Sequence, residues 1–154
     1  MPKSVDVLVI ALSSPILIGV YEDGELIEEI SSEEKSSDYL PLIFETLLQK
    51  YELKRVLYAN GPGSFMAIKV AYIFLKSLSI LKNIELLATD AFYFNENQPI
   101  KAIGKLCFVK IASEIKTQKL ETLPQSSFRL PSQLDYNEFT TEATPLYMIG
   151  AVGQ

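Results

Sequence analysis

The sequence predicts one α/β domain followed by a small C-terminal appendage, and three observations support this. Residues 5–11 form an apolar, β-branched run, the pattern of a strand covered on both faces. Residues 38–51 and 64–82 both have the apolar spacing of helices. Strand-like runs at residues 55–59 and 85–89 flank the second helical segment, as α/β folds require. Because the chain has 154 residues, two full domains would be cramped.

The N-terminal region predicts three antiparallel strands. Residues 16–21 follow a break at Pro15 and form the second expected strand. Asp23-Gly24 is a strong hairpin signal, and it leads into a third strand at residues 26–30. The sheet should therefore begin as an antiparallel three-stranded unit.

The first helix is expected over residues 38–51, with Asp38 as its N-cap and Pro41 inside its first turn. Its apolar positions form a stripe wider than contact with one sheet requires. These positions are Tyr39, Leu40, Ile43, Phe44, Leu47, Leu48 and Tyr51.

A strand-turn-helix unit follows. After the strand at residues 55–59, Asn60-Gly61-Pro62-Gly63 predicts a tight turn and Ser64 a helix N-cap. The helix is apolar nearly all round, so it should be buried on two sides, by the sheet and by either the first helix or another protein chain. Residues 85–89 then return as a parallel strand, which gives the order β-β-β-α-β-α-β.

The composition changes after residue 95. Residues 1–95 are therefore assigned to the α/β domain and residues 96–154 to a reduced second lobe. Residues 102–111 and 114–123 predict a hairpin or two strands. From residue 124 onward the periodicity is too weak to predict a fold.

Composition excludes several classes of function. The absence of histidine removes histidine-dependent triads and zinc sites, and a single cysteine, Cys107, removes an internal disulfide framework. The net charge of −5 and the pI near 4.8 argue against direct electrostatic capture of nucleic acid. The longest apolar stretch contains Lys69 and Lys76, and no secretory leader is recognised at the N-terminus. We therefore expect a cytoplasmic protein without a membrane contact.

The best candidate for chemistry is Gly61-Pro62-Gly63-Ser64-Phe65, because a turn that opens a helix can bind an anion. The alternative is a purely structural turn, in which Pro62 fixes φ, Gly63 adopts a conformation closed to other residues and Ser64 caps the helix. The structural alternative is favoured, since neither the Walker nor the dinucleotide-binding pattern is present.

Three other candidates have structural explanations. Ser64 with Lys69 could form a nucleophile and base, but a serine at a helix start is ordinarily a cap. The carboxylates of Glu28, Glu29, Glu33 and Glu34 could hold a divalent metal, although a solvated acidic edge is favoured. Cys107 is interpreted as a buried small hydrophobic residue.

These residues resemble the TsaB (YeaZ) family, whose motif reads Gly-Pro-Gly-Ser-Phe-Thr-Gly-Leu-Arg. The match covers Gly61 to Phe65, after which Met66, Ala67, Ile68 and Lys69 replace Thr, Gly, Leu and Arg. Leu40-Pro41-Leu42-Ile43 is similar to the family's Leu-Pro-x-Ile, and Pro145-Leu146-Tyr147 to its C-terminal Pro-x-Tyr. The resemblance covers about the first 95 residues well.

The resemblance implies an actin-like, ribonuclease-H-like (ASKHA) half-domain and a role in threonylcarbamoyladenosine modification of tRNA. A TsaB-like protein is a non-catalytic accessory subunit there, without a cofactor or metal. It binds a TsaD-like enzyme through its first two helices, and a TsaE-like ATPase joins them, so contact with tRNA is only indirect. The expected interface consists of Leu40, Ile43, Phe44, Leu47, Phe65, Ile68, Lys69, Tyr72 and Ile73. When the chain is alone, a homodimer through these helices is expected.

The sequence also departs from the family. Ala11-Leu12-Ser13 replaces the acidic residue that actin-like phosphotransferases keep after the first strand, and Lys35-Ser36-Ser37 stands where histidine is common. A small nucleotide-binding phosphotransferase that uses residues 61–64 is the alternative function. A peptidase is a remote alternative, because histidine is absent.

Overall fold

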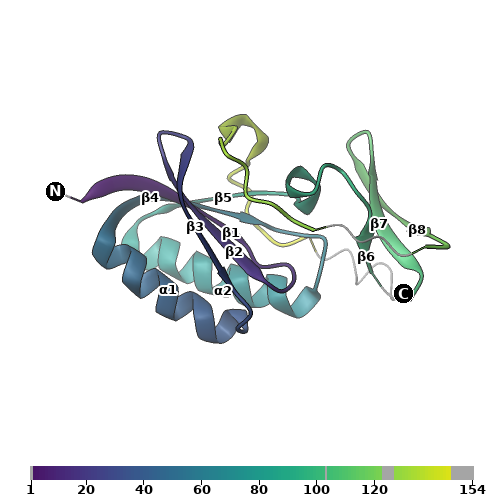
Figure 1. Ribbon diagram of the computed structural model, residues 1–154, viewed down its shortest axis with the longest axis horizontal. Coiled ribbons are helices and arrows are strands. Elements are labelled where there is room, and N and C mark those ends of the chain that lie inside the picture. The colour runs from purple at the N-terminus through teal and green to yellow at the C-terminus, as the bar shows by residue number, and fades with distance from the viewer. Residues whose placement is uncertain (1, 103, 123–126, 147–154) are drawn as a thin grey trace.

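The computed structural model describes residues 2–102, 104–122 and 127–146 (Figure 1). Its main domain contains strands β1 (Lys3–Ile10), β2 (Ile16–Glu22), β3 (Glu25–Ser32), β4 (Tyr51–Ala59) and β5 (Glu85–Thr89), with helices α1 (Ser36–Lys50) and α2 (Phe65–Lys82). A 3-10 helix (Ala91–Phe94) then leads to β6 (Ile100–Lys101), β7 (Leu106–Ile111) and β8 (Glu114–Lys119). A second 3-10 helix spans Tyr136–Glu138.

The first sheet has the strand order β3-β2-β1-β4-β5. β1 and β2 are antiparallel, as are β2 and β3, whereas β4 is parallel to both β1 and β5. Helices α1 and α2 lie side by side on one face of this sheet (Figure 1). The predicted mixed five-stranded α/β architecture is therefore confirmed.

The helix-covered face of the sheet contains one of two apolar cores. Alternate residues of β1, including Val5, Val7 and Val9, pack there against buried residues of both helices. Phe44 of α1 and Phe74 of α2 join the helices through a ring contact at 5.6 Å. Among the described residues, no helix is long and apolar enough to cross a membrane.

The local boundaries differ from the prediction at α1. The helix begins at Ser36, two residues before Asp38, so Asp38 lies in the first turn and is not the N-cap. Pro41 consequently lies beyond the first turn, inside the helix. Tyr51 leaves the helix with φ of −131° because it pairs with Lys3 of β1, and β4 therefore begins before residue 55.

The opposite face of the sheet is covered by a segment that we call the C-terminal strap, residues 127–146. It begins beside β3, where Leu26 donates a backbone hydrogen bond to Ser132 at 3.0 Å. It reaches the other edge at β5, where Ala88 and Thr140 exchange backbone hydrogen bonds of 2.9 and 2.8 Å. Between these two edges, buried Leu134 belongs to the same apolar core as Leu8 of β1. The strap thus completes the second core.

A buried polar cluster fixes the strap over β1. The carboxylate of Asp6 is only 4% exposed, and its Oδ2 accepts hydrogen bonds from Tyr136 and, at 3.3 Å, from Arg55. The Arg55 guanidinium lies over the Tyr136 ring at 5.1 Å and also contacts Glu85 at 3.3 Å. Burial and the hydrogen bond to Asp6 raise the pKa of Tyr136, so the phenol keeps the proton that it donates.

The second sheet has the order β6-β7-β8, and β7 and β8 form the predicted hairpin. Lys110 of β7 holds this sheet to the main domain through an ion pair with Asp90, with Nζ and Oδ2 separated by 2.6 Å. The region assigned to a reduced second lobe thus contains this sheet and the strap, and the strap lies along the main domain.

Candidate functional site

The turn between β4 and α2 has two glycines with different roles. Gly61 has φ of +126°, and a Cβ there would lie 2.8 Å from the carbonyl oxygen of Leu146 in the strap. Gly63 was expected to adopt a backbone conformation closed to other residues. What limits a side chain at Gly63 is instead the close approach of Leu12, whose Cβ would lie 3.1 Å from an added Cβ. The residue that requires glycine for its backbone angles is therefore Gly61.

The polar groups of the turn are largely engaged within the protein. Ser64 is the N-cap of α2, as predicted, because its Oγ accepts a hydrogen bond from the amide of Ala67 at 3.4 Å. Ala91 donates to the carbonyl of Gly61 at 2.8 Å, and Leu146 donates to that of Asn60 at 2.7 Å. These contacts show that the turn anchors the strap and the first 3-10 helix.

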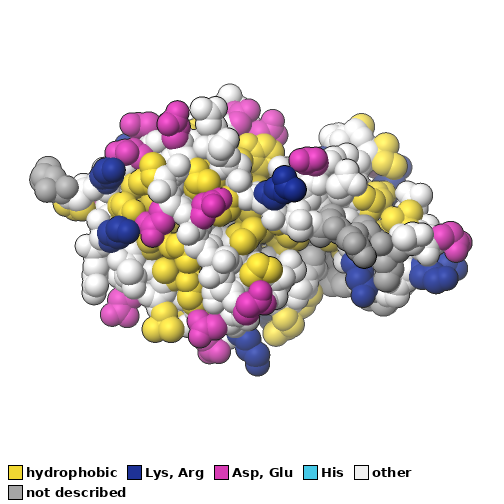
Figure 2. Space-filling view, in the orientation of Figure 1, with side chains coloured by type: hydrophobic (Ala, Val, Ile, Leu, Met, Phe, Trp, Pro, Cys, Tyr) yellow, Lys and Arg dark blue, Asp and Glu magenta, His cyan; other side chains and the backbone are white. Residues whose placement is uncertain are grey.

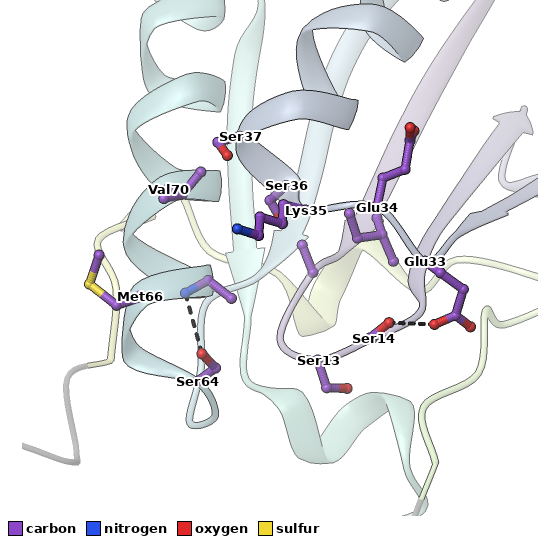
Figure 3. Close-up of a pocket in the computed structure, with 13 residues that line it drawn as sticks. Ser13, Ser14, Glu33, Glu34, Lys35, Ser36, Ser37, Ser64, Met66 and Val70 are labelled. Carbon is purple, nitrogen blue, oxygen red and sulfur yellow. Dashed lines mark hydrogen bonds between the residues drawn. The ribbon is translucent and has the colours of Figure 1, made fainter.

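A pocket of about 360 Å³ lies beside this turn (Figure 3). Serine hydroxyls from the end of β1 and from the starts of both helices line it, together with Lys35 and two glutamates. Ser14 donates to Glu33 at 2.7 Å, and Ala11 of the pocket lining is buried. The pocket can offer hydrogen bonds, whereas its mixed charges do not single out an anion.

Two of the four acidic residues predicted as an alternative metal site, Glu28 and Glu33, bond different partners. Glu28 accepts hydrogen bonds from Tyr51 at 2.7 Å and Lys50 at 3.1 Å, whereas Glu33 bonds Ser14. Within residues 2–102, 104–122 and 127–146, no group of three or more His, Cys, Asp or Glu could hold a metal ion. Cys107 is buried, as expected, and its burial raises the pKa of the thiol.

Glu28 leads to a prediction about pH. Hydrogen bonds from Tyr51 and Lys50 lower its pKa from the ordinary value of 4.5. The resulting stabilisation is present above that value and is lost as pH falls through the lower, folded-state pKa. Glu28→Gln should therefore reduce the free energy of unfolding at pH 7 by less than about 1 kcal/mol, because the site is near the surface. Urea titrations at pH 7 and pH 3 should show a smaller difference between variant and wild type at pH 3; an equal difference would contradict this assignment.

Four members of the predicted partner interface lie inside the folded chain. Leu40, Phe44, Leu47 and Ile68 are buried in the protein's own cores, since the apolar stripe of each helix faces the sheet. Ile43 is half-buried, as is Tyr72, which stacks on Tyr58 at a centroid distance of 6.3 Å. Phe65, Lys69 and Ile73 are exposed.

An exposed apolar surface on the helices was predicted only in part, since Ile73 was expected there whereas Met66, Ile80, Leu81 and Leu42 were not. Met66, Ile73 and Ile80 are 63%, 54% and 70% exposed, and their seven-residue spacing places them along one outward stripe of α2. Exposed Leu81 of α2 and Leu42 of α1 add to this surface, which we call the apolar helix face. The seven-residue repeat was visible in the sequence, but the continuous apolarity of α2 concealed which stripe faces outward.

The order β3-β2-β1-β4-β5 with two helices on one face defines a mixed five-stranded α/β domain. Its fold is that of YeaZ from Pseudomonas aeruginosa, with a TM-score of 0.57 at 12% identity over 77% of this chain. This chain spans 65% of the length of that YeaZ.

A second solved structure from P. aeruginosa gives the same result. It is described as an uncharacterized protein with similarity to peptidase YeaZ, and it matches with a TM-score of 0.51 and 14% identity. The match covers 84% of this chain and 70% of that one. No protein-family model and no curated protein matches the sequence. The structural similarity to these two proteins therefore establishes the fold of this chain.

Proposed function

We propose that this chain is a divergent TsaB (YeaZ) protein that binds and activates a TsaD-like enzyme in threonylcarbamoyladenosine modification of tRNA. Two independent features support the assignment to this family. The fold is shared with YeaZ, and the Gly-Pro-Gly-Ser-Phe sequence that resembles the family motif forms the turn before α2. The motif and the fold thus both support the same family assignment.

The apolar helix face is the observation that carries the proposal. Five large apolar side chains project from the sides of α1 and α2 that face away from the sheet. A monomer rarely leaves such a surface uncovered, and apolar side chains on adjacent helices fit a helical partner. The interface would be centred on Ile73, with Phe65 and Lys69 at its border. In the absence of the enzyme, a second copy of this chain would cover the same surface.

An accessory role without catalysis is supported by the composition of the candidate site. The sequence contains no histidine, and the turn uses Gly61 and Ser64 for structural contacts. In the proposed complex the TsaD-like enzyme carries the chemistry and holds the tRNA, and a TsaE-like ATPase joins the two proteins. This chain would act by stabilising the active form of its partner.

Ile73→Glu tests the proposed interface. A carboxylate in the centre of the apolar surface would be desolvated on pairing, so the dissociation constant with the organism's own TsaD-like enzyme should rise at least about 30-fold. Ile111→Glu is the matched control, because Ile111 is 58% exposed but belongs to the second sheet. Isothermal titration calorimetry would measure both variants, and circular dichroism would verify their folds.

Equal affinity of the two variants would remove the apolar helix face as the interface. The activating role is tested by reconstituted threonylcarbamoyl transfer to tRNA, with and without this chain. We expect activity to depend on the chain and to be reduced by Ile73→Glu. Full activity in its absence would contradict the proposed function.

A further inference from the structure

Charge is distributed very unevenly along the sequence. Residues 100–120 contain five of the 14 basic residues but only one of the 19 acidic residues. This segment therefore carries a net charge of +4, whereas the rest of the chain carries −9. In Figure 2, basic side chains lie at the end of the molecule formed by the second sheet, with an acidic side chain at its tip, and side chains of both charges spread over the main domain. Such asymmetry within an acidic protein indicates an anionic partner for the second sheet.

Three lysines lie at one end of this sheet although the sequence separates them. Lys101 of β6 is opposite Cys107 of β7, and Lys119 of β8 is opposite the adjacent Leu106. Lys105 precedes β7, and its carbonyl accepts a hydrogen bond from Leu120 at 2.9 Å. All three side chains are exposed, and we call them the lysine cluster.

The lysine cluster forms no ion pair within the described residues, although Glu121 lies two residues after Lys119. Two other lysines of the region are paired, Lys110 with Asp90 at 2.6 Å and Lys116 with Glu114 at 3.4 Å. The ion pairs found among residues 2–102, 104–122 and 127–146 include none of the cluster. Protection of sheet edges explains lysines on β6 and β8, but Lys105 lies outside both edge strands. Because Lys101 and Lys119 pair with the adjacent residues Cys107 and Leu106, their side chains leave opposite faces of the sheet. The three charges therefore surround one end of the sheet, and a partner that wraps around this end can contact all three.

The surroundings of the lysine cluster favour a phosphate backbone over a protein or lipid. Exposed Ile111 lies at the opposite end of β7, next to the hairpin turn. The cluster therefore has no large exposed apolar neighbour, among described residues, of the kind that anchors a protein interface or inserts into a bilayer. Lysines act as point charges that neutralise phosphates without reading base edges.

We propose that the lysine cluster binds the phosphate backbone of RNA without sequence preference. The choice of RNA over DNA rests on the proposed function, in which tRNA is the substrate of the assembled enzyme. This direct contact goes beyond that function, in which contact with tRNA is expected to be only indirect. The second sheet would supply a local attraction that the acidic main domain cannot provide.

Fluorescence anisotropy with a labelled RNA stem-loop tests this proposal. The full-length chain is compared with a variant that combines Lys101→Gln, Lys105→Gln and Lys119→Gln. At low salt this variant should lose about tenfold or more in affinity, and the slope of log K against log salt should shrink by about 2 to 3. A control with the same charge change combines Lys54→Gln, Lys76→Gln and Lys82→Gln, all exposed residues of the main domain. It should retain most of the RNA affinity.

The same titrations include a DNA duplex and anionic phosphatidylserine vesicles. The proposal would be overturned if the two triple variants lost RNA affinity equally, or if the wild type did not bind RNA. Tighter binding of the wild type to DNA or to vesicles than to RNA would also overturn it. Calorimetry of the lysine-cluster variant with the TsaD-like enzyme separates the two hypotheses. Unchanged pairing would leave the proposed function intact even if the RNA contact is absent.

Discussion

Gly61→Ala is expected to lower the free energy of unfolding by about 2–4 kcal/mol, since it combines backbone strain with a steric clash. Residues with a side chain rarely adopt the φ of +126° found at Gly61. An added Cβ would also lie 2.8 Å from the carbonyl oxygen of Leu146, a backbone atom that cannot rotate away. Relief of the clash would require the strap to move, which would weaken the hydrogen bond from Leu146 to Asn60.

Gly104→Ala provides the control for this prediction. Gly104 also has a positive φ, +58°, but an added Cβ would meet nothing within 4 Å. Gly104→Ala should lower the free energy of unfolding by only about 1–2 kcal/mol, because it introduces backbone strain without a steric clash. Urea denaturation followed by circular dichroism would measure both variants. Equal destabilisation would show that contact between the turn and the strap contributes little.

Arg55→Leu should destabilise the protein by about 2–3 kcal/mol, because it leaves the buried Asp6 carboxylate without its cation. The effect should be below that of a fully buried pair, since the Arg55 side chain is 40% exposed. The substitution also removes the guanidinium that lies over the Tyr136 ring. Both losses weaken attachment of the strap to β1.

A double-mutant cycle isolates the contribution of charge. Asp6→Asn replaces the carboxylate with a neutral amide that no longer requires a cation, so adding Arg55→Leu to it should cost at least about 1 kcal/mol less than in the wild type. The free energies of unfolding of the four proteins would be compared at one pH and one salt concentration. Additive effects would show that Arg55 stabilises through packing or through its contact with Glu85, and not through Asp6.

Local sequence signals predicted the main domain well because they report on nearby residues. The Asp23-Gly24 turn, the Ser64 cap and the strand-turn-helix unit all occur in the structure. The start of α1 was less predictable. Asp38 had the chemistry of an N-cap, but the chain enters the helix at Ser36, and pairing of Tyr51 with Lys3 determines where β4 begins.

The candidate interface was predictable only in part. Apolar periodicity identifies which residues avoid water, but it does not distinguish a partner's surface from the protein's own core. Leu40, Phe44 and Leu47 therefore entered the predicted interface although they face the sheet. Exposure in the folded chain was needed to identify Met66 and Ile80 instead.

The sequence by itself determined the α/β class, the mixed order of helices and strands, and the glycine-containing turn before α2, because spacing and turn chemistry are local. Tertiary structure alone revealed the strap, its anchorage through Tyr136 to Asp6, and the position of Lys101, Lys105 and Lys119 at one end of the second sheet. The physical reason is that these features join residues far apart in the chain. Asp6 and Tyr136 meet across a separation of 130 residues, which no local periodicity records.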